Sequence, residues 1–112
     1  MTNVADILDR AADEMMIRGK ATGRLVENDS VCAIGALCVA NGMTEKAMIP
    51  SGPNHWIMLP GVVEFGTFLK KKYQSLITTG VIKCVYKFSD QNSEETVIEM
   101  MRLCAKELRE NG

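Results

Sequence analysis

Between Ser30 and Gly42 the chain reads Ser-Val-Cys-Ala-Ile-Gly-Ala-Leu-Cys-Val-Ala-Asn-Gly, an apolar run that no charged side chain interrupts. A helix without a polar face cannot turn one side to water, so other elements have to cover it. Ser30, or Asp29 before it, can cap its N-terminus, and Gly42 can end it. The run therefore predicts a short buried helix around which the rest of the chain packs.

Small side chains recur along one stripe of this predicted helix. Cys32, Gly35, Ala36 and Val39 follow one another at steps of one to three residues, which places them on neighbouring positions of one face. Small residues allow a second backbone to approach closely. We expect the first or the last helix of the chain to be that partner.

Two amphipathic helices are expected near the ends of the chain. The first is capped by Thr2 or Asn3 and stopped by Gly19, and the last is capped by Ser93, with acidic residues in its first turn. In both, apolar residues return at helical spacing. The expected buried faces are Val4, Ile7, Leu8, Ala11, Ala12, Met15 and Met16 in the first helix, and Val97, Ile98, Met101, Cys104, Ala105 and Leu108 in the last.

The central part of the chain is less regular. Residues Pro50–Trp56 contain prolines and a glycine that interrupt regular structure, whereas Val62 to about Thr78 has helical spacing. Val81–Phe88 fits a strand or a helix, and a strand would need the short extended piece around Arg24–Glu27 as its partner. Ser89–Asn92 has the composition of a loop.

These elements predict a mainly α, compact single domain over residues 1–112, with about four helices, an irregular Pro/Gly central loop and room for one short strand pair. Its net charge of −1 gives no general attraction to phosphates. The apolar run is too short to span a membrane, and the N-terminus lacks the basic start of a secretory signal. We expect a cytoplasmic protein with reduced cysteines, no cofactor, and no nucleic-acid or membrane partner.

Three features occur together: an opening helix with Ala11-Ala12, the run Ser30-Val-Cys-Ala-Ile-Gly-Ala-Leu37, and Asp90 ahead of a final helix with an acidic first turn. In these the chain resembles a family of short, functionally uncharacterised proteins of actinobacteria and their phages, which carry a Cys-x-x-Gly-Ala-Leu helix and a Trp-Asn-Asp loop. Gly42–Lys83 is unmatched, and Phe88-Ser89-Asp90 stands in place of Trp-Asn-Asp. The resemblance implies a helical fold and a phage or mobile-element source, but no mechanism.

Candidate catalytic and metal-binding residues are few. Cys32 and Cys38 are six residues apart, about 240° around a helix, so they do not form the close pair that a zinc site uses. The only histidine, His55, could act as a base for Cys32, with Asp90 orienting it. Burial would suppress the reactivity of that thiol. We expect Cys32 to be a packing residue, and a Cys/His enzyme is the least favoured alternative.

The Pro/Gly loop is the most suggestive binding surface. Trp56-Ile-Met58-Leu59 is an apolar tetrad next to His55, and tryptophan is common at the centre of protein interfaces. The tetrad either stays exposed and binds a protein or folds back onto the core. Lys70 and Lys71 belong to the best basic cluster, although lysine runs on helices are usually solvated faces.

The sequence thus predicts a small non-enzymatic interaction protein, a phage accessory factor that binds a host protein in the host cytoplasm or a second copy of itself. The residues expected to bind are His55, Trp56, Met58, Lys70, Lys71 and Asp90. The alternative is a small-ligand protein that holds a nucleotide-like anion between the N-terminus of the buried helix, His55 and basic side chains.

Overall fold

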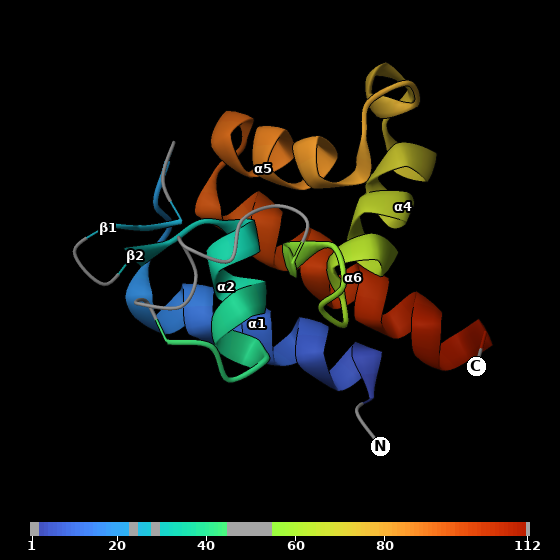
Figure 1. The fold of residues 1–112 in the computed structure, drawn as a ribbon. Coiled ribbons are helices and arrows are strands. Elements are labelled where there is room, and N and C mark those ends of the chain that lie inside the picture. Colours follow the sequence, from blue (N-terminus) through green and yellow to red (C-terminus); the bar gives the residue numbers. More distant parts are fainter. Residues whose placement is uncertain (1–2, 23–24, 28–29, 45–54, 112) are drawn as a thin grey trace.

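The computed structural model describes residues 3–22, 25–27, 30–44 and 55–111, and its architecture is mainly α (Figure 1). Within these residues there are five α-helices, where the sequence predicts about four, and one pair of short strands. The predicted fold class is confirmed. In chain order the elements are α1 (Val4–Arg18), β1 (Val26–Glu27), β2 (Ser30–Val31), α2 (Ala33–Ala40), α4 (Val62–Lys72), the 3₁₀ helix η1 (Gln74–Leu76), α5 (Val81–Gln91) and α6 (Glu94–Asn111).

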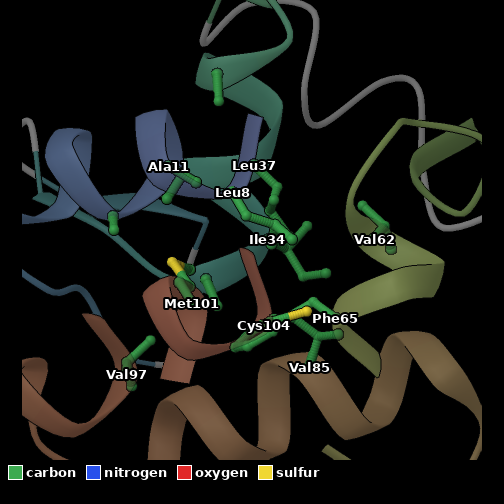
Figure 2. Packing of buried hydrophobic residues seen from close by; sticks show 14 of the residues in the cluster. Leu8, Ala11, Ile34, Leu37, Val62, Phe65, Val85, Val97, Met101 and Cys104 are labelled. Carbon is green, nitrogen blue, oxygen red and sulfur yellow. The ribbon is translucent and has the colours of Figure 1, made fainter. Parts of the chain in front are cut away.

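Helix α2 lies in the core, as its uncharged sequence predicts. Every residue from Val31 to Cys38 is buried. Ile34 and Leu37 belong to one apolar cluster with Leu8 of α1 and Val62 of α4 (Figure 2). The helix therefore gains its stability from the elements that cover it.

The start of α2 differs from the prediction. Cys32 is the N-cap, and its Sγ accepts a hydrogen bond of 3.5 Å from the Gly35 N–H. Ser30 lies in β2 instead, opposite Glu27 of β1 in an antiparallel pair. Gly42 follows the C-cap residue with a φ of 85°, so the predicted glycine stop is confirmed.

The close backbone approach expected at the stripe of small residues occurs at Gly35, but there the approaching backbone is not that of a helix. A Cβ built on Gly35 would overlap the carbonyl oxygen of Leu25. The same oxygen accepts a hydrogen bond of 3.1 Å from the Cys32 N–H. At Gly35 the neighbour is thus Leu25, the residue before β1, while α2 as a whole also packs against α1, one of the two expected partners.

Helices α1 and α6 lie side by side, and both begin at predicted caps (Figure 1). The Oδ1 of Asn3 accepts a hydrogen bond of 2.9 Å from the Ala5 N–H, and the Oγ of Ser93 accepts one of 3.3 Å from the Thr96 N–H. The buried face of α1 is shorter than expected, because the side chain of Met16 is 55% exposed.

The helix expected over Val62–Thr78 ends earlier, at Lys72. Residues 81–91 then form α5, which settles the choice between strand and helix for 81–88. The loop predicted over Ser89–Asn92 is wrong for its first three residues, which continue α5. The segment is helical because Cys84, Val85 and Phe88 fall on one face and are buried there.

Candidate functional site

The apolar tetrad after His55 divides between core and surface. His55 is exposed, while Trp56 and Leu59 are partly buried and pack against the core cluster. Ile57 and Met58 point outward, and Met58 is 80% exposed. Both expectations for the tetrad therefore hold in part: it covers the core with two side chains and offers two to solvent. Residues 50–54 of the predicted loop lie outside the described residues.

Lys70 and Lys71 lie in the last turn of α4, where the negative end of the helix dipole favours cations. Lys70 is partly buried, and Lys71 lines a cavity of about 240 Å³ between α4 and α6. The next residue, Lys72, forms an ion pair of 3.3 Å with Glu107 of α6. Because α4, roughly 16 Å long, runs between the lysines and the segment around His55, the two groups are not one site.

Burial dominates the environment of the Cys32 thiol. Burial raises the pKa of this thiol; hydrogen bonds from the backbone N–H groups of Gly35 and Ile34 lower it, and the negative charge of Asp90 raises it, so that the net change is a rise. His55 is not among the groups that act on it. Asp90, in α5, is thus close enough to Cys32 to influence its pKa, although the arrangement with His55 as a base is not formed around this thiol. The thiolate is disfavoured by this environment, which is typical of a packing cysteine.

Ser89, predicted in a loop, is a buried residue of α5 that links this helix to α2 and to Lys20. The side chain of Ser89 is fully buried, and its Oγ accepts a hydrogen bond of 3.0 Å from the N–H of Ala33, the first residue of α2. The Ser89 carbonyl accepts 2.8 Å from Lys20 Nζ, and the Lys20 N–H donates 2.9 Å to Glu94 of α6. In the sequence, the position of Ser89 next to the apolar Phe88 on one helical face was the only indication that this serine is buried.

The hydrogen bond between Ala33 and Ser89 also argues against the alternative in which the N-terminus of α2 binds an anion. An anion at the N-terminus of α2 would need free backbone N–H groups. The Ala33 N–H is bonded to Ser89 and the Gly35 N–H to the sulfur of Cys32. Residues 31–38 are buried as well. The geometry therefore disfavours a ligand at this helix end.

A ladder of ion pairs fixes α1 against α6. Arg109 contacts Asp6 at 2.8 Å and Asp9 at 2.6 Å. Arg102 contacts Asp9 at 3.5 Å and Asp13 at 2.6 Å. Asp6, near the start of α1, pairs with Arg109 near the end of α6, and Asp13, further along α1, pairs with the earlier Arg102. The two helices are therefore antiparallel and in a defined register.

An open apolar groove adjoins the ion-pair ladder at Arg102. On α1, Met16 follows Asp9 and Asp13 at helical steps of four and three residues, so it continues the edge that faces α6. Here the structure has a groove of about 650 Å³. We call it the Met16 groove, and its lining residues are Met16, Glu94, Glu95, Ile98, Glu99, Arg102, Leu103 and Lys106.

Apolar side chains in and beside the Met16 groove are accessible to a partner. Met16 is 55% exposed, and the adjoining Ile17 is 80% exposed. Ile98 and Leu103 of α6 are only partly buried. Helical spacing predicts Met16 and Ile98 on buried faces, since spacing alone does not show which edge of an apolar stripe a neighbouring helix leaves uncovered.

Comparisons with protein-family models, with curated proteins and with solved structures give no match. The resemblance to the actinobacterial and phage family therefore stays a prediction. Among the described residues, no helix is long and apolar enough to cross a membrane. Within the same part of the chain, no group of three or more His, Cys, Asp or Glu residues could hold a metal ion.

Proposed function

We propose that this protein acts without catalysis, by binding a protein partner through the Met16 groove. The observation that carries the proposal is the exposure of Met16 in an open apolar groove, with the exposed Ile17 next to it in the chain. Large apolar side chains gathered in one exposed patch are typical of interaction sites, whereas single ones are common on any surface. If the family resemblance holds, the protein is a phage accessory factor and the partner is a host protein.

The ion-pair ladder supports this proposal. Binding costs less when the surface does not have to become ordered first. Arg102 connects the ladder to the groove, because it pairs with Asp9 and Asp13 and also lines the groove wall. The α6 face of the groove and Met16 of α1 are thus already held in place relative to each other.

Ile57 and Met58 are a second exposed apolar pair, on the segment where the sequence predicts the binding site. Trp56 contributes less to a binding surface than expected, since it packs against the core. Met16 lies in an open apolar groove together with Ile98 and Leu103, so we place the partner on the Met16 groove. The two surfaces differ in their residues, and substitutions can separate them.

Affinity capture from a lysate of the source organism, with matched variants, tests the proposal. The groove variant is Met16→Ser with Ile17→Ser, and the control is Met58→Ser with Ile77→Ser, at positions 80% and 63% exposed. All four side chains are mainly solvated, so both variants should keep their thermal midpoints. A partner retained by wild type and control but lost from the groove variant supports the proposal. Loss from the control alone would move the site to Met58, and retention by every variant would refute it.

A further inference from the structure

Two of the acidic side chains in the Met16 groove have no ionic partner among the described residues. Glu95 and Glu99 are exposed on α6, one turn apart, and no ion pair of the described residues includes either. Glu94, beside them, accepts a hydrogen bond from the Lys20 N–H. One end of the groove thus carries three carboxylates around apolar Met16 and Ile98.

The cations near this end are already engaged. Arg102 is held by Asp9 and Asp13, and the Nζ of Lys20 donates to the Ser89 carbonyl and to Thr22. Arg18 pairs with Glu14 at 2.8 Å. Lys106 lies at the far end of the groove, about three helical turns from Glu95. Among the described residues, therefore, no ion pair neutralises Glu95 or Glu99 at the acidic end.

From these charges we infer that the occupant of the Met16 groove is a basic amphipathic helix of a partner protein, an inference that rests on the proposed function. Its apolar stripe lies against Met16, Ile98 and Leu103, and its lysine or arginine side chains lie over Glu95 and Glu99. The lining of α6 from Glu95 to Lys106 is roughly 16 Å long, which is the length of about three helical turns. An apolar stripe at helical spacing matches a groove between two helices.

Charge complementarity argues against an acidic or neutral occupant. Burying the carboxylates of Glu95 and Glu99 under an apolar or acidic surface would remove their water without replacing it. A basic side chain supplies charge-assisted hydrogen bonds at the same place. The apolar contacts then contribute affinity, and the charges select the partner.

Fluorescence anisotropy with two labelled model peptides tests the inference. Each peptide has about 14 residues with leucine at helical spacing, and its polar positions are mainly lysine in one peptide and mainly glutamate in the other. We expect wild type to bind the lysine peptide about tenfold more tightly than the glutamate peptide. Light scattering of the free protein should show a monomer, and a dimer closed over the groove would overturn the inference.

Charge-reversal variants supply the decisive comparison. Glu95→Lys with Glu99→Lys should weaken binding of the lysine peptide about tenfold and allow the glutamate peptide to bind. The control, Glu27→Lys with Glu110→Lys, makes the same change in net charge at two exposed positions outside the groove, and it should retain the preference of wild type. Equal binding of both peptides, or equal weakening by the control, overturns the inference. If the lysine peptide fails to bind while capture of a lysate partner still depends on Met16, the proposed function stands and this inference fails.

Discussion

The Oγ of Ser89 accepts a hydrogen bond from the N–H of Ala33, 56 positions away in the chain, and both residues are fully buried. Ser89 thereby satisfies a donor at the start of α2 that the helix itself cannot use. Its carbonyl binds Lys20 as well, so the end of α5 is attached to the loop after α1. This serine is a structural junction, and we expect its loss to destabilise the protein.

Replacing Ser89 by alanine removes the acceptor and leaves the Ala33 N–H buried without a partner. We expect a loss of about 1–3 kcal/mol in the free energy of unfolding, the cost of one buried unsatisfied donor. Urea denaturation followed by far-ultraviolet circular dichroism measures it. Ser75→Ala, at an exposed position of η1, is the matched control and should change stability by no more than about 0.5 kcal/mol. Equal effects of the two substitutions would show that the hydrogen bond contributes nothing.

Replacing Gly35 by alanine tests the contact between α2 and the segment before β1. The new Cβ would overlap the Leu25 carbonyl oxygen, and a rigid backbone cannot yield as a side chain can. We expect destabilisation of about 3 kcal/mol, at the upper end for overpacking. Gly80→Ala is the control, because a Cβ there meets nothing within 4 Å. A stable Gly35→Ala protein would contradict the close approach.

The cysteines predict how stability changes at alkaline pH. Burial is the main cause that raises the pKa of Cys38 and of Cys104 to about 12. In the unfolded chain a cysteine thiol has a pKa of about 8.5. Between these values the unfolded state has lost protons that the folded state retains, so stability falls as pH rises. The stability that the two protonated thiols contribute to the folded state is fully present below about pH 8.5. It is lost as the pH approaches 12.

Urea midpoints measured at intervals from pH 8 to pH 11 check this dependence. Each thiol can contribute at most about 1.4 kcal/mol per pH unit. The double variant Cys38→Ala/Cys104→Ala should be less stable at neutral pH, because it leaves cavities. Its stability should nevertheless fall less steeply above pH 9 than that of wild type. Identical slopes would mean that these thiols ionise in the folded protein as they do in the unfolded chain.

The ladder between α1 and α6 predicts a small, salt-dependent effect. The side chain of Arg102 is 37% exposed, so Arg102→Gln should cost no more than about 1 kcal/mol at low salt. Screening should reduce that loss further in 1 M sodium chloride, where the Debye length is about 3 Å. Lys83→Gln, at an exposed position without an ion pair among the described residues, is the control. A loss for Arg102→Gln that does not depend on salt would assign its role to packing instead.

Apolar positions were enough to predict the presence of α1, α2 and α6, and the predicted caps mark the starts of α1 and α6 but not that of α2. Asn3 and Ser93 act as expected. The composition of Ser89–Asn92 was misleading, since serine, aspartate and asparagine favour turns as isolated residues. Ser89 stays helical because its hydroxyl finds a partner on α2. That contact depends on the fold, and no local pattern contains it.

The candidate site shows the same limit. In a helical stripe of apolar residues, the sequence does not distinguish an exposed side chain from a buried one. The burial of Met15 and the exposure of Met16 therefore could not be predicted. Only the register of α1 against α6, set by Asp9 and Asp13 on Arg102, places Met16 at an open edge. Trp56 is the reverse case, a residue expected at a binding surface that packs against the core.

Site-specific photocrosslinking tests the central claim most directly, because it reports what lies on the Met16 groove. Ile17, which is 80% exposed beside Met16, is replaced by photoreactive benzoylphenylalanine, and the protein is irradiated in a lysate of the source organism. Ile77, 63% exposed beyond α4, receives the same group as a control. We predict one dominant adduct at position 17, formed with a peptide that has a basic amphipathic sequence, and none of it at position 77. The same adducts at both positions, or a dominant adduct at position 77 alone, would contradict the assignment of the Met16 groove as the binding site.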